Sequence, residues 1–179
     1  KQQLAERLLS AEALVDSGSL MKGNISTEAW KKLADSAARL SKTQLLIDES
    51  AEITVTKIKA KLRRLKNLGL VVVDYLQLMH ADERIDNRVL EIGAITRGFK
   101  LMAKDLGVPI ILCSQLRREA GGTKTGDKMP QISDLRDSGA IEQDADVIIF
   151  LHRDDYGNYD NDTSNGVVTA KAIVAKNRH

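Results

Sequence analysis

The stretch "NLGLVVVDYLQLM", residues 67–79, decides the fold because a run of aliphatic residues in it ends in a single aspartate. The unbroken apolar run 70–73 is typical of a parallel strand that is covered on both faces. Asp74 closes this run, and a carboxylate at the edge of a hydrophobic strand is costly unless a cation meets it. Ligands of α/β proteins bind at the carboxyl ends of strands, so we predict that Asp74 faces a ligand there.

Hydrophobic periodicity in the rest of the chain predicts alternating helices and strands. Apolar residues recur at helical spacing over 3–15, 26–40, 55–65 and 87–106, and short apolar runs predict strands over 44–48, 108–116, 147–152 and 167–178. Strands separated by helices favour an α/β fold with a mostly parallel central sheet flanked by helices. No repeat or low-complexity linker interrupts the pattern, so we expect a single domain over 1–179.

Local signals predict where these helices begin and end. The turn residues "DSGS" at 16–19 should end the first helix, and Ser26 should cap the second, whose apolar face is Ala29, Trp30, Leu33 and Ala37. Gly107 should end the helix over 87–106. The polar stretch 117–131 has neither period and is predicted to be a mobile loop.

The composition is that of an ordinary soluble domain. The 179 residues are 42% hydrophobic and 29% charged, and the net charge of +2 permits a nucleic-acid partner without requiring one. The chain has one Trp, three Tyr and two Phe, too few for stacking of bases on aromatic platforms, so any bound nucleic acid should be held by its phosphates. Cys113, the one cysteine, excludes an intramolecular disulfide and favours a reducing cytoplasm.

The chain is expected to be an excerpt from a longer protein, and no membrane partner is expected. Residue 1 is a lysine rather than a methionine, and the first residues already have helical spacing. No apolar segment approaches the length that is needed to cross a bilayer.

Asp74 and Gln115 are the strongest candidates for chemistry. Four hydrophobic residues followed by Asp form a Walker B pattern, in which the carboxylate holds Mg²⁺, usually through water, on a nucleotide. The neighbouring strand ends in Ser114 and Gln115, and parallel strands open on the same edge, so Gln115 could reach the terminal phosphate or the attacking water. The alternatives are an apolar strand that happens to end in Asp at a loop, and a Gln that caps a loop.

Two groups of cations admit both a functional and a structural interpretation. Lys176 and Arg178 are two apart on a predicted strand and point to the same side, so they could reach the phosphates of a neighbouring subunit. The alternative is an exposed basic strand end. The basic residues over 57–66 are more typical of a solvated helix face than of a DNA site.

Other candidate motifs fail on spacing. "GGTKTGDK" at 121–128 has Asp127 where a phosphate loop needs lysine, and "DYGNYDNDTSNG" at 155–166 lacks the glycine and glutamate positions of an EF-hand. The three histidines show no metal-ligand spacing. The chain therefore combines a candidate Mg²⁺ carboxylate with no phosphate loop, so that either it is no ATPase or the loop lies before Lys1.

Four segments resemble the DnaB-type replicative helicases, which are RecA-fold, hexameric, ATP-driven DNA-unwinding enzymes. They are "VVVDYLQLM", "NRVLEIGAITRGFKLMAKDLGVPIILCSQL", "ISDLRDSGAIEQDADVIIFLHRDD" and "AKNRH", and the likeness runs over 1–179. The resemblance implies a RecA-like P-loop NTPase fold that is truncated at both ends. In this family the phosphate loop, the catalytic glutamate and an N-terminal collar domain precede such a segment, so the 179 residues alone are expected to be inactive.

The resemblance also implies residue roles. Asp74 matches the Walker B aspartate that binds Mg²⁺ and ATP, and Gln115 matches the phosphate-sensing glutamine. Lys176 and Arg178 match the cations that act on the nucleotide of the adjacent subunit. DNA contacts are implied for two loops of the central channel, with Asp137 standing where the family often has glutamate; the residues concerned are Arg136, Asp137, Gly139, Arg117 and Arg118.

The expected function is ATP-driven unwinding of duplex DNA at the replication fork by a homo-hexameric ring on single-stranded DNA. Expected partners are single-stranded DNA, primase and a helicase loader, in the cytoplasm of a bacterium or of a phage-infected cell. One alternative is a RecA-like recombinase, which the "DYLQLM" and "LRDSGAIEQDAD" wording disfavours. Another is a non-catalytic relative that only docks a loader or primase, which the presence of Asp74, Gln115 and Arg178 disfavours.

Overall fold

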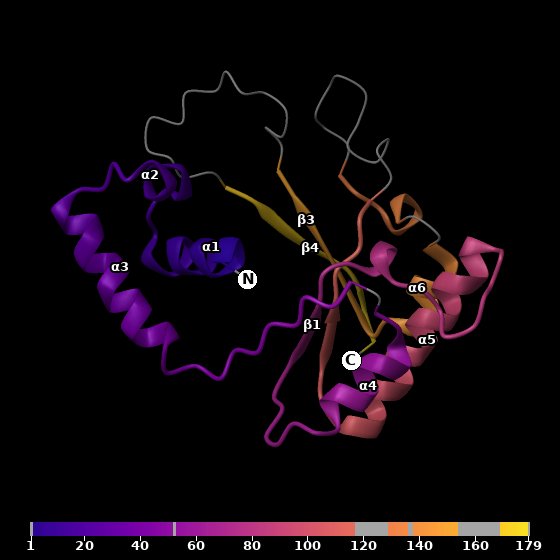
Figure 1. The fold of residues 1–179 in the computed structure, drawn as a ribbon. Coiled ribbons are helices and arrows are strands. Elements are labelled where there is room, and N and C mark those ends of the chain that lie inside the picture. Colours follow the sequence, from indigo (N-terminus) through magenta and orange to yellow (C-terminus); the bar gives the residue numbers. More distant parts are fainter. Residues whose placement is uncertain (1, 52, 117–128, 136–137, 154–168, 179) are drawn as a thin grey trace. The chain divides into compact units, whose positions relative to one another are not determined.

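The computed structural model describes residues 2–51, 53–116, 129–135, 138–153 and 169–178. The chain forms two compact units, an N-terminal unit of residues 1–51 and a C-terminal unit of residues 52–179, each treated by itself below. Figure 1 shows their elements in chain order. The loop predicted over 117–131 lies outside the described residues except at its last three positions.

The N-terminal unit consists of three helices, α1 (Gln2–Ala13), α2 (Ser17–Lys22) and α3 (Thr27–Leu40). Ser26 caps α3 as predicted, since its hydroxyl accepts a hydrogen bond from the backbone N–H of Ala29 at 3.2 Å. The first helix ends before residues 16–19, as predicted, but residues 17–19 are helical rather than a turn. The Asp16 carboxylate accepts from the N–H of Ser19 at 2.6 Å, so these residues begin α2 instead.

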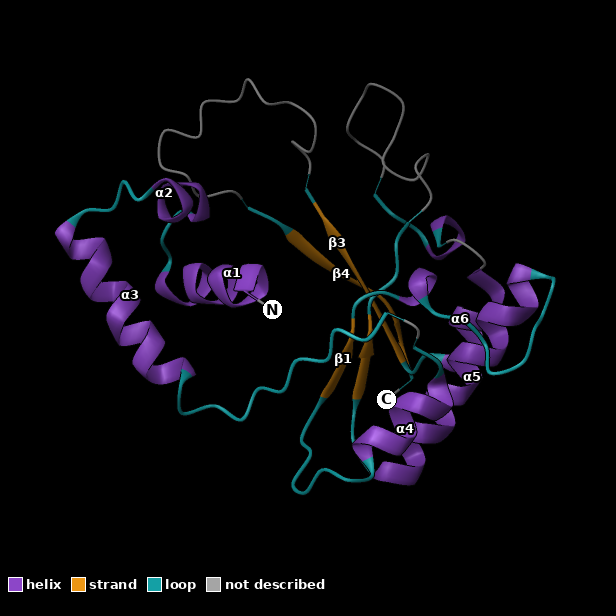
Figure 2. Ribbon diagram, viewed as in Figure 1, coloured by secondary structure: helices purple, strands orange, loops and turns teal. Residues whose placement is uncertain are grey.

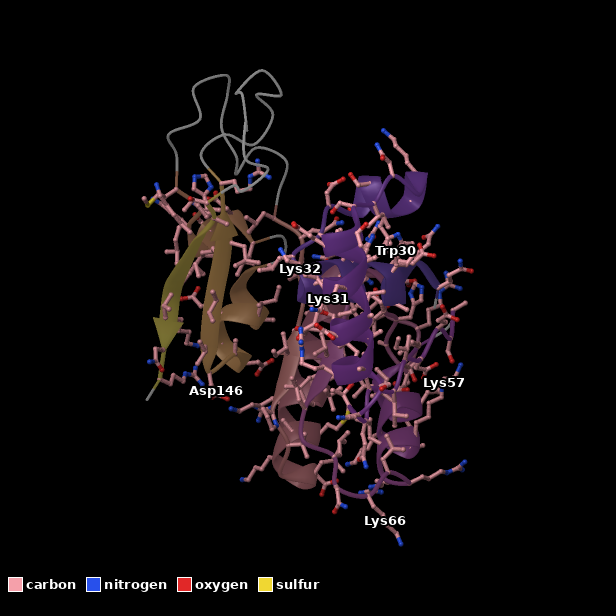
Figure 3. The ribbon with its side chains drawn as sticks, turned by 90° about the vertical axis from the view of Figure 1, so that its left-hand side faces the viewer. Trp30, Lys31, Lys32, Lys57, Lys66 and Asp146 are labelled. Carbon is pink, nitrogen blue, oxygen red and sulfur yellow. The ribbon has the colours of Figure 1, made fainter. Side chains whose placement is uncertain are left out.

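Two other expectations for this unit are corrected. Trp30 is 57% exposed and projects from α3, whereas Leu33 and Ser36 are buried, because α1 packs on the stripe that contains these two residues (Figure 3). The strand predicted over 44–48 is absent, and these residues have no regular structure. A strand needs a neighbour to satisfy its backbone groups, and the described part of the N-terminal unit contains no strand to pair with it.

Among its described residues, the C-terminal unit has two pairs of strands. β1 (Val71–Val73) and β2 (Ile110–Leu112) are parallel, with Val73 opposite Leu112. β3 (Val147–His152) and β4 (Lys171–Asn177) are antiparallel. The helical elements in the described part of this unit are α4 (Val55–Leu62), α5 (Arg88–Leu106), α6 (Ser138–Asp144) and the 3₁₀ turns η1 (Leu76–Leu78) and η3 (Ile132–Asp134). The unit is thus mixed helix and strand, as an α/β fold requires.

Helix α5 organises the core of this unit, and its bounds agree closely with the prediction. Asn87 caps its N-terminus, and Gly107 ends it with a left-handed φ of 64°. The predicted apolar stripe is buried on one face and packs with residues of η1, α6 and β3. The cluster comprises Leu76, Met79, Ile92, Ile95, Phe99, Met102, Leu135, Ile141, Ile148 and Phe150.

Helix α4 packs against α5, and Figure 2 shows the two helices side by side. A Cβ on Gly98 would lie 2.9 Å from Cγ1 of Val55, so the absence of a side chain permits this approach. Lys59 and Arg63 pair with the Asp105 carboxylate at 2.8 and 2.9 Å. Part of the basic face of α4 is therefore used within the chain, which agrees with the structural interpretation of that face.

The β1–β2 pair is covered on one face only by the described part of the C-terminal unit. Val73, Ile110 and Leu112 pack against the core, whereas Val72 is 57% and Ile111 51% exposed. The expectation of burial on both faces is thus not met within the described unit, because α4 and α5 contribute to the same core cluster.

We predict that Ile95→Ala lowers the free energy of unfolding by about 2–5 kcal/mol, because a side chain that is 1% exposed leaves a cavity in the α5 core. Leu101→Ala, at a residue of the same helix that is 54% exposed, is the control and should cost about 0.5 kcal/mol or less. Urea denaturation followed by circular dichroism measures both. Equal losses would contradict the assignment of the buried face.

Candidate functional site

Asp74 and Gln115 lie at the same edge of the parallel β1–β2 pair. Beyond the Val73–Leu112 pair, the N–H of Cys113 donates to the carbonyl of Val73 at 2.9 Å. Asp74 and Gln115 follow at these strand ends, and both side chains are exposed rather than sealed in the interior. The peptide bond between Asp74 and Tyr75 is cis. The structure thus brings the two principal candidates to one accessible rim.

The thiol of Cys113 lies close enough to Asp74 for the carboxylate charge to affect its pKa. Burial raises the pKa of its thiol, and the negative charge of Asp74 raises it further. The Asp74 carboxylate therefore acts on the neighbouring strand end, and the thiol of Cys113 stays protonated at neutral pH.

Gln77 joins the two strand ends, and sequence reasoning missed it. Its Nε2 donates to Oγ of Ser114 at 2.9 Å and to the carbonyl of Gln115 at 3.4 Å. Its Oε1 accepts from the N–H of Gln115 at 3.3 Å. The signal that could have found it is a polar residue between two leucines, three positions after the candidate metal ligand Asp74.

An ion pair on the first turn of α5 holds the segment after β1. Arg88 donates to the carbonyls of Gln77 at 3.0 Å and Met79 at 3.2 Å, and it also pairs with the carboxylate of Glu91. Glu91 accepts from the N–H of Ala81 at 3.1 Å, and its side chain is 12% exposed. The backbone over 77–81 is therefore fixed to the rigid core helix.

The side chains of Lys176 and Arg178 both contact the C-terminal end of α6. Lys176 donates to the carbonyls of Glu142 and, at 2.7 Å, Ala145, and Arg178 donates to the carbonyl of Gln143 at 2.6 Å. The last carbonyls of a helix lack partners within it and carry partial negative charge, so they attract cations. The two side chains reach the same helix end, although the strand predicted over 167–178 ends at Asn177 and Arg178 lies directly after β4.

The candidate DNA-contacting residues are only partly described. Arg117, Arg118, Arg136 and Asp137 lie outside the described residues, and Gly139 is exposed near the start of α6. The residues that flank the two predicted channel loops are described. Leu116 and Leu135 form an antiparallel bridge, which joins the loop after Gln115 to the segment before residue 136.

The donor set at this rim fits Mg²⁺ on a nucleotide better than a self-contained metal site. The described residues contain no group of three or more His, Cys, Asp or Glu side chains that could hold an ion. Asp74 instead offers one exposed carboxylate. Mg²⁺ is commonly held by one or two carboxylates, with phosphates and water completing its octahedron.

No helix among the described residues is both long and apolar enough to span a membrane.

The family model for the DnaB-like helicase C-terminal domain matches residues 1–179. The chain belongs to this family. It is 43% identical over 182 residues to "Replicative DNA helicase DnaB" of Leifsonia xyli subsp. xyli (strain CTCB07), an alignment that covers 100% of this chain and 39% of the relative. This DnaB-family chain thus spans much less than half the length of that curated relative.

Solved structures of related proteins agree with the fold. "The Structure Of A DnaB-Like Replicative Helicase And Its Interactions With Primase" matches with a TM-score of 0.84 and 33% identity, covering 99% of this chain and 43% of that chain. A second solved structure, of an isolated ATPase domain, matches with a TM-score of 0.83 and 33% identity, covering 99% of this chain and 63% of that chain. The expected family and the RecA-like α/β fold are confirmed.

We predict that Glu91→Gln lowers the free energy of unfolding at pH 7 by about 1–2 kcal/mol, because a charged hydrogen-bond acceptor for Arg88 is lost. Burial raises the pKa of Glu91, but the hydrogen bonds from Arg88 and Ala81 and the charges of Arg88 and His80 outweigh it and hold the pKa below 4.5. A carboxyl group whose pKa is depressed by folding stabilises the fold at pH values above its ordinary pKa. This stabilisation is lost as the pH falls through the pKa of the folded state.

The difference in the free energy of unfolding between wild type and Glu91→Gln should therefore be constant near neutral pH and shrink below about pH 4.5. Denaturation curves at several pH values measure it, with the same substitution at the exposed Glu28 of α3 as the control. A difference that grows on acidification would contradict the ion-pair assignment.

Proposed function

We propose that this chain is the larger part of the motor domain of a hexameric replicative helicase, which hydrolyses ATP to move along single-stranded DNA and separate duplex DNA at the replication fork. The observation that carries this proposal is the placement of Asp74 and Gln115 at adjacent ends of two parallel strands, in a chain of the DnaB-like family. Curated relatives from Leifsonia xyli and Bacillus subtilis are both named replicative DNA helicases, which supports the same function.

In the proposed site, the Asp74 carboxylate would hold Mg²⁺, and the ion would supply positive charge that neutralises the phosphates of ATP during phosphoryl transfer. Gln115 reaches the terminal phosphate or orients the attacking water from the neighbouring strand end. The 179 residues contain no phosphate-loop motif, so we expect them to need the rest of the protein for hydrolysis.

The bridge between Leu116 and Leu135 supports a link from the nucleotide to DNA. Leu116 follows the proposed phosphate sensor, and Leu135 precedes Arg136 in the proposed channel loop. If Gln115 shifts when the terminal phosphate leaves, the adjacent Leu116 would move with it. Because Leu116 is bridged to Leu135, both loops would be displaced where they begin. Grip by Arg136, Arg117, Arg118 and the backbone near Asp137 and Gly139 would act on phosphates and so be independent of sequence.

Lys176 and Arg178 are proposed to act on the nucleotide of the adjacent subunit, where a cation stabilises the charge of the transferring phosphoryl group. Their side chains contact the end of α6, the helix that begins beside the proposed DNA loop. Helix α6 is thus suited to join the DNA held by one subunit to the hydrolysis at its neighbour.

We propose a homo-hexamer that works with primase and a loader in the cytoplasm of a bacterium, or of a bacterium infected by phage. One of the solved DnaB-like helicases is described together with its interactions with primase, which supports this partner.

We predict that Arg178→Ala lowers ATP turnover of the full-length ring by about a thousandfold or more, as loss of a cation that acts in trans on the phosphoryl group should. Binding of ATP by each subunit should persist, because the residue belongs to the neighbour's site. Steady-state hydrolysis and equilibrium nucleotide binding measure the two. Arg84→Ala, at an exposed arginine, is the control, and normal turnover by Arg178→Ala would refute the assignment.

We predict that Arg136→Ala weakens the binding of single-stranded DNA and reduces the slope of log affinity against log salt by about one, because one phosphate contact is lost. Fluorescence anisotropy with an unstructured oligonucleotide at several salt concentrations measures both. Arg84→Ala again serves as the control. An unchanged affinity and slope would count against the channel-loop assignment.

A further inference from the structure

Both the nitrogen and the oxygen of the Gln77 side-chain amide form hydrogen bonds with the segment that follows β2. The amide nitrogen donates to Oγ of Ser114 at 2.9 Å and to the carbonyl of Gln115 at 3.4 Å. The amide oxygen accepts from the N–H of Gln115 at 3.3 Å. The side chain of Gln77 thus contacts both backbone polar groups of Gln115 and the hydroxyl of the residue before it.

These contacts extend the β1–β2 pairing beyond the point where the backbones diverge. After β1, the N–H of Leu76 donates to the carbonyl of Cys113 at 2.9 Å, and the chain then turns into η1. A side-chain amide carries the same donor and acceptor as a peptide group. Gln77 therefore supplies the hydrogen bonds that a further strand residue would have supplied to Gln115.

Gln77 is itself held in place by the core helix. Arg88 donates to the carbonyl of Gln77 at 3.0 Å and pairs with Glu91, which holds the backbone of Ala81. The backbone of Gln77 is thus bonded to α5, while its side chain is bonded to the segment that follows β2. Gln115, by contrast, is exposed at the end of β2 and would otherwise have a less constrained backbone.

We infer that Gln77 is a positioning residue that fixes the backbone of Gln115, and so places the Gln115 side chain opposite the nucleotide held at Asp74. This inference rests on the proposed function. Gln77 acts through Gln115 and contacts no phosphate itself. Its loss should therefore slow the chemical step while leaving nucleotide binding nearly unchanged, whereas a merely structural contact would affect stability and binding together.

The test compares Gln77→Ala, Ser114→Ala and the double variant in the full-length protein, with Gln44→Ala at an exposed glutamine as the control. Gln77→Ala should lower kcat for ATP by about ten- to a hundredfold, the range that a small misplacement of a catalytic group produces. The affinity for a fluorescent ADP should change by less than about threefold, because positioning of Gln115 matters chiefly to the terminal phosphate.

Ser114→Ala removes one of the three hydrogen bonds of Gln77 with little change in volume, so it should give a smaller loss of kcat in the same direction. The double variant should lose no more activity than Gln77→Ala alone, because the two residues act through one contact. A kcat of Gln77→Ala within about twofold of wild type, or losses that multiply in the double variant, would overturn the inference.

Hydrogen exchange separates this inference from the proposed function. In Gln77→Ala the peptide that contains Gln115 should exchange about five- to tenfold faster, because its N–H loses the acceptor Oε1 of Gln77, and this holds whether or not the protein hydrolyses ATP. Unchanged exchange would overturn the positioning role. A wild-type protein without DNA-stimulated hydrolysis, but with this exchange difference, would contradict the proposed function and leave the contact of Gln77 established.

Discussion

The parallel pairing of β1 with β2, with Val73 opposite Leu112, is the constraint on which the site depends. A shift of one residue would turn each side chain of a strand to the opposite face, and the core beneath the strands forbids such a shift. The register therefore sets Asp74 and Gln115 on one rim, and the amide of Gln77 secures the point where the two backbones separate. The proposed metal–nucleotide site would therefore depend on this core for the placement of its side chains.

Helix α5 connects this rim to the rest of the C-terminal unit. Its first turn holds the segment 77–81 through Arg88 and Glu91, and its middle fills the core. Further along, Thr96 donates to the Asp144 carboxylate at 2.8 Å, and Lys100 donates to Asp146, which lies between α6 and β3 (Figure 3). One rigid helix thus carries both the proposed nucleotide rim and the end of α6.

The end of α6 is a meeting point for groups with different proposed tasks. The carboxylates of Asp144 and Asp146 are paired with α5. The carbonyls at the end of α6 accept from Lys176 of β4 and from Arg178, which directly follows β4. The helix begins next to the proposed DNA loop. In the proposed hexamer, such a helix would connect the DNA contacts of one subunit with the charges of Lys176 and Arg178 that act on the neighbouring subunit.

The sequence by itself determined the features that depend on neighbours along the chain. The apolar stripe of α5 and its end at Gly107, the Ser26 cap of α3, and the polar residues that follow β1 and β2 all follow from local spacing and backbone preferences. The amino-acid sequences around Asp74 and after Leu135 were also specific enough to indicate the family. The assignment of a single domain over 1–179 remains a prediction.

Only the tertiary structure decided which face of α3 is buried, that residues 44–48 form no strand, and that Gln77, Lys176 and Arg178 donate to particular backbone groups. Trp30 and Leu33 fit a helical stripe equally well, and the position of α1 settles which of them is covered. A glutamine in an apolar turn gives no local sign of its partner 38 residues away. Burial and long-range hydrogen bonds depend on groups that only folding brings together.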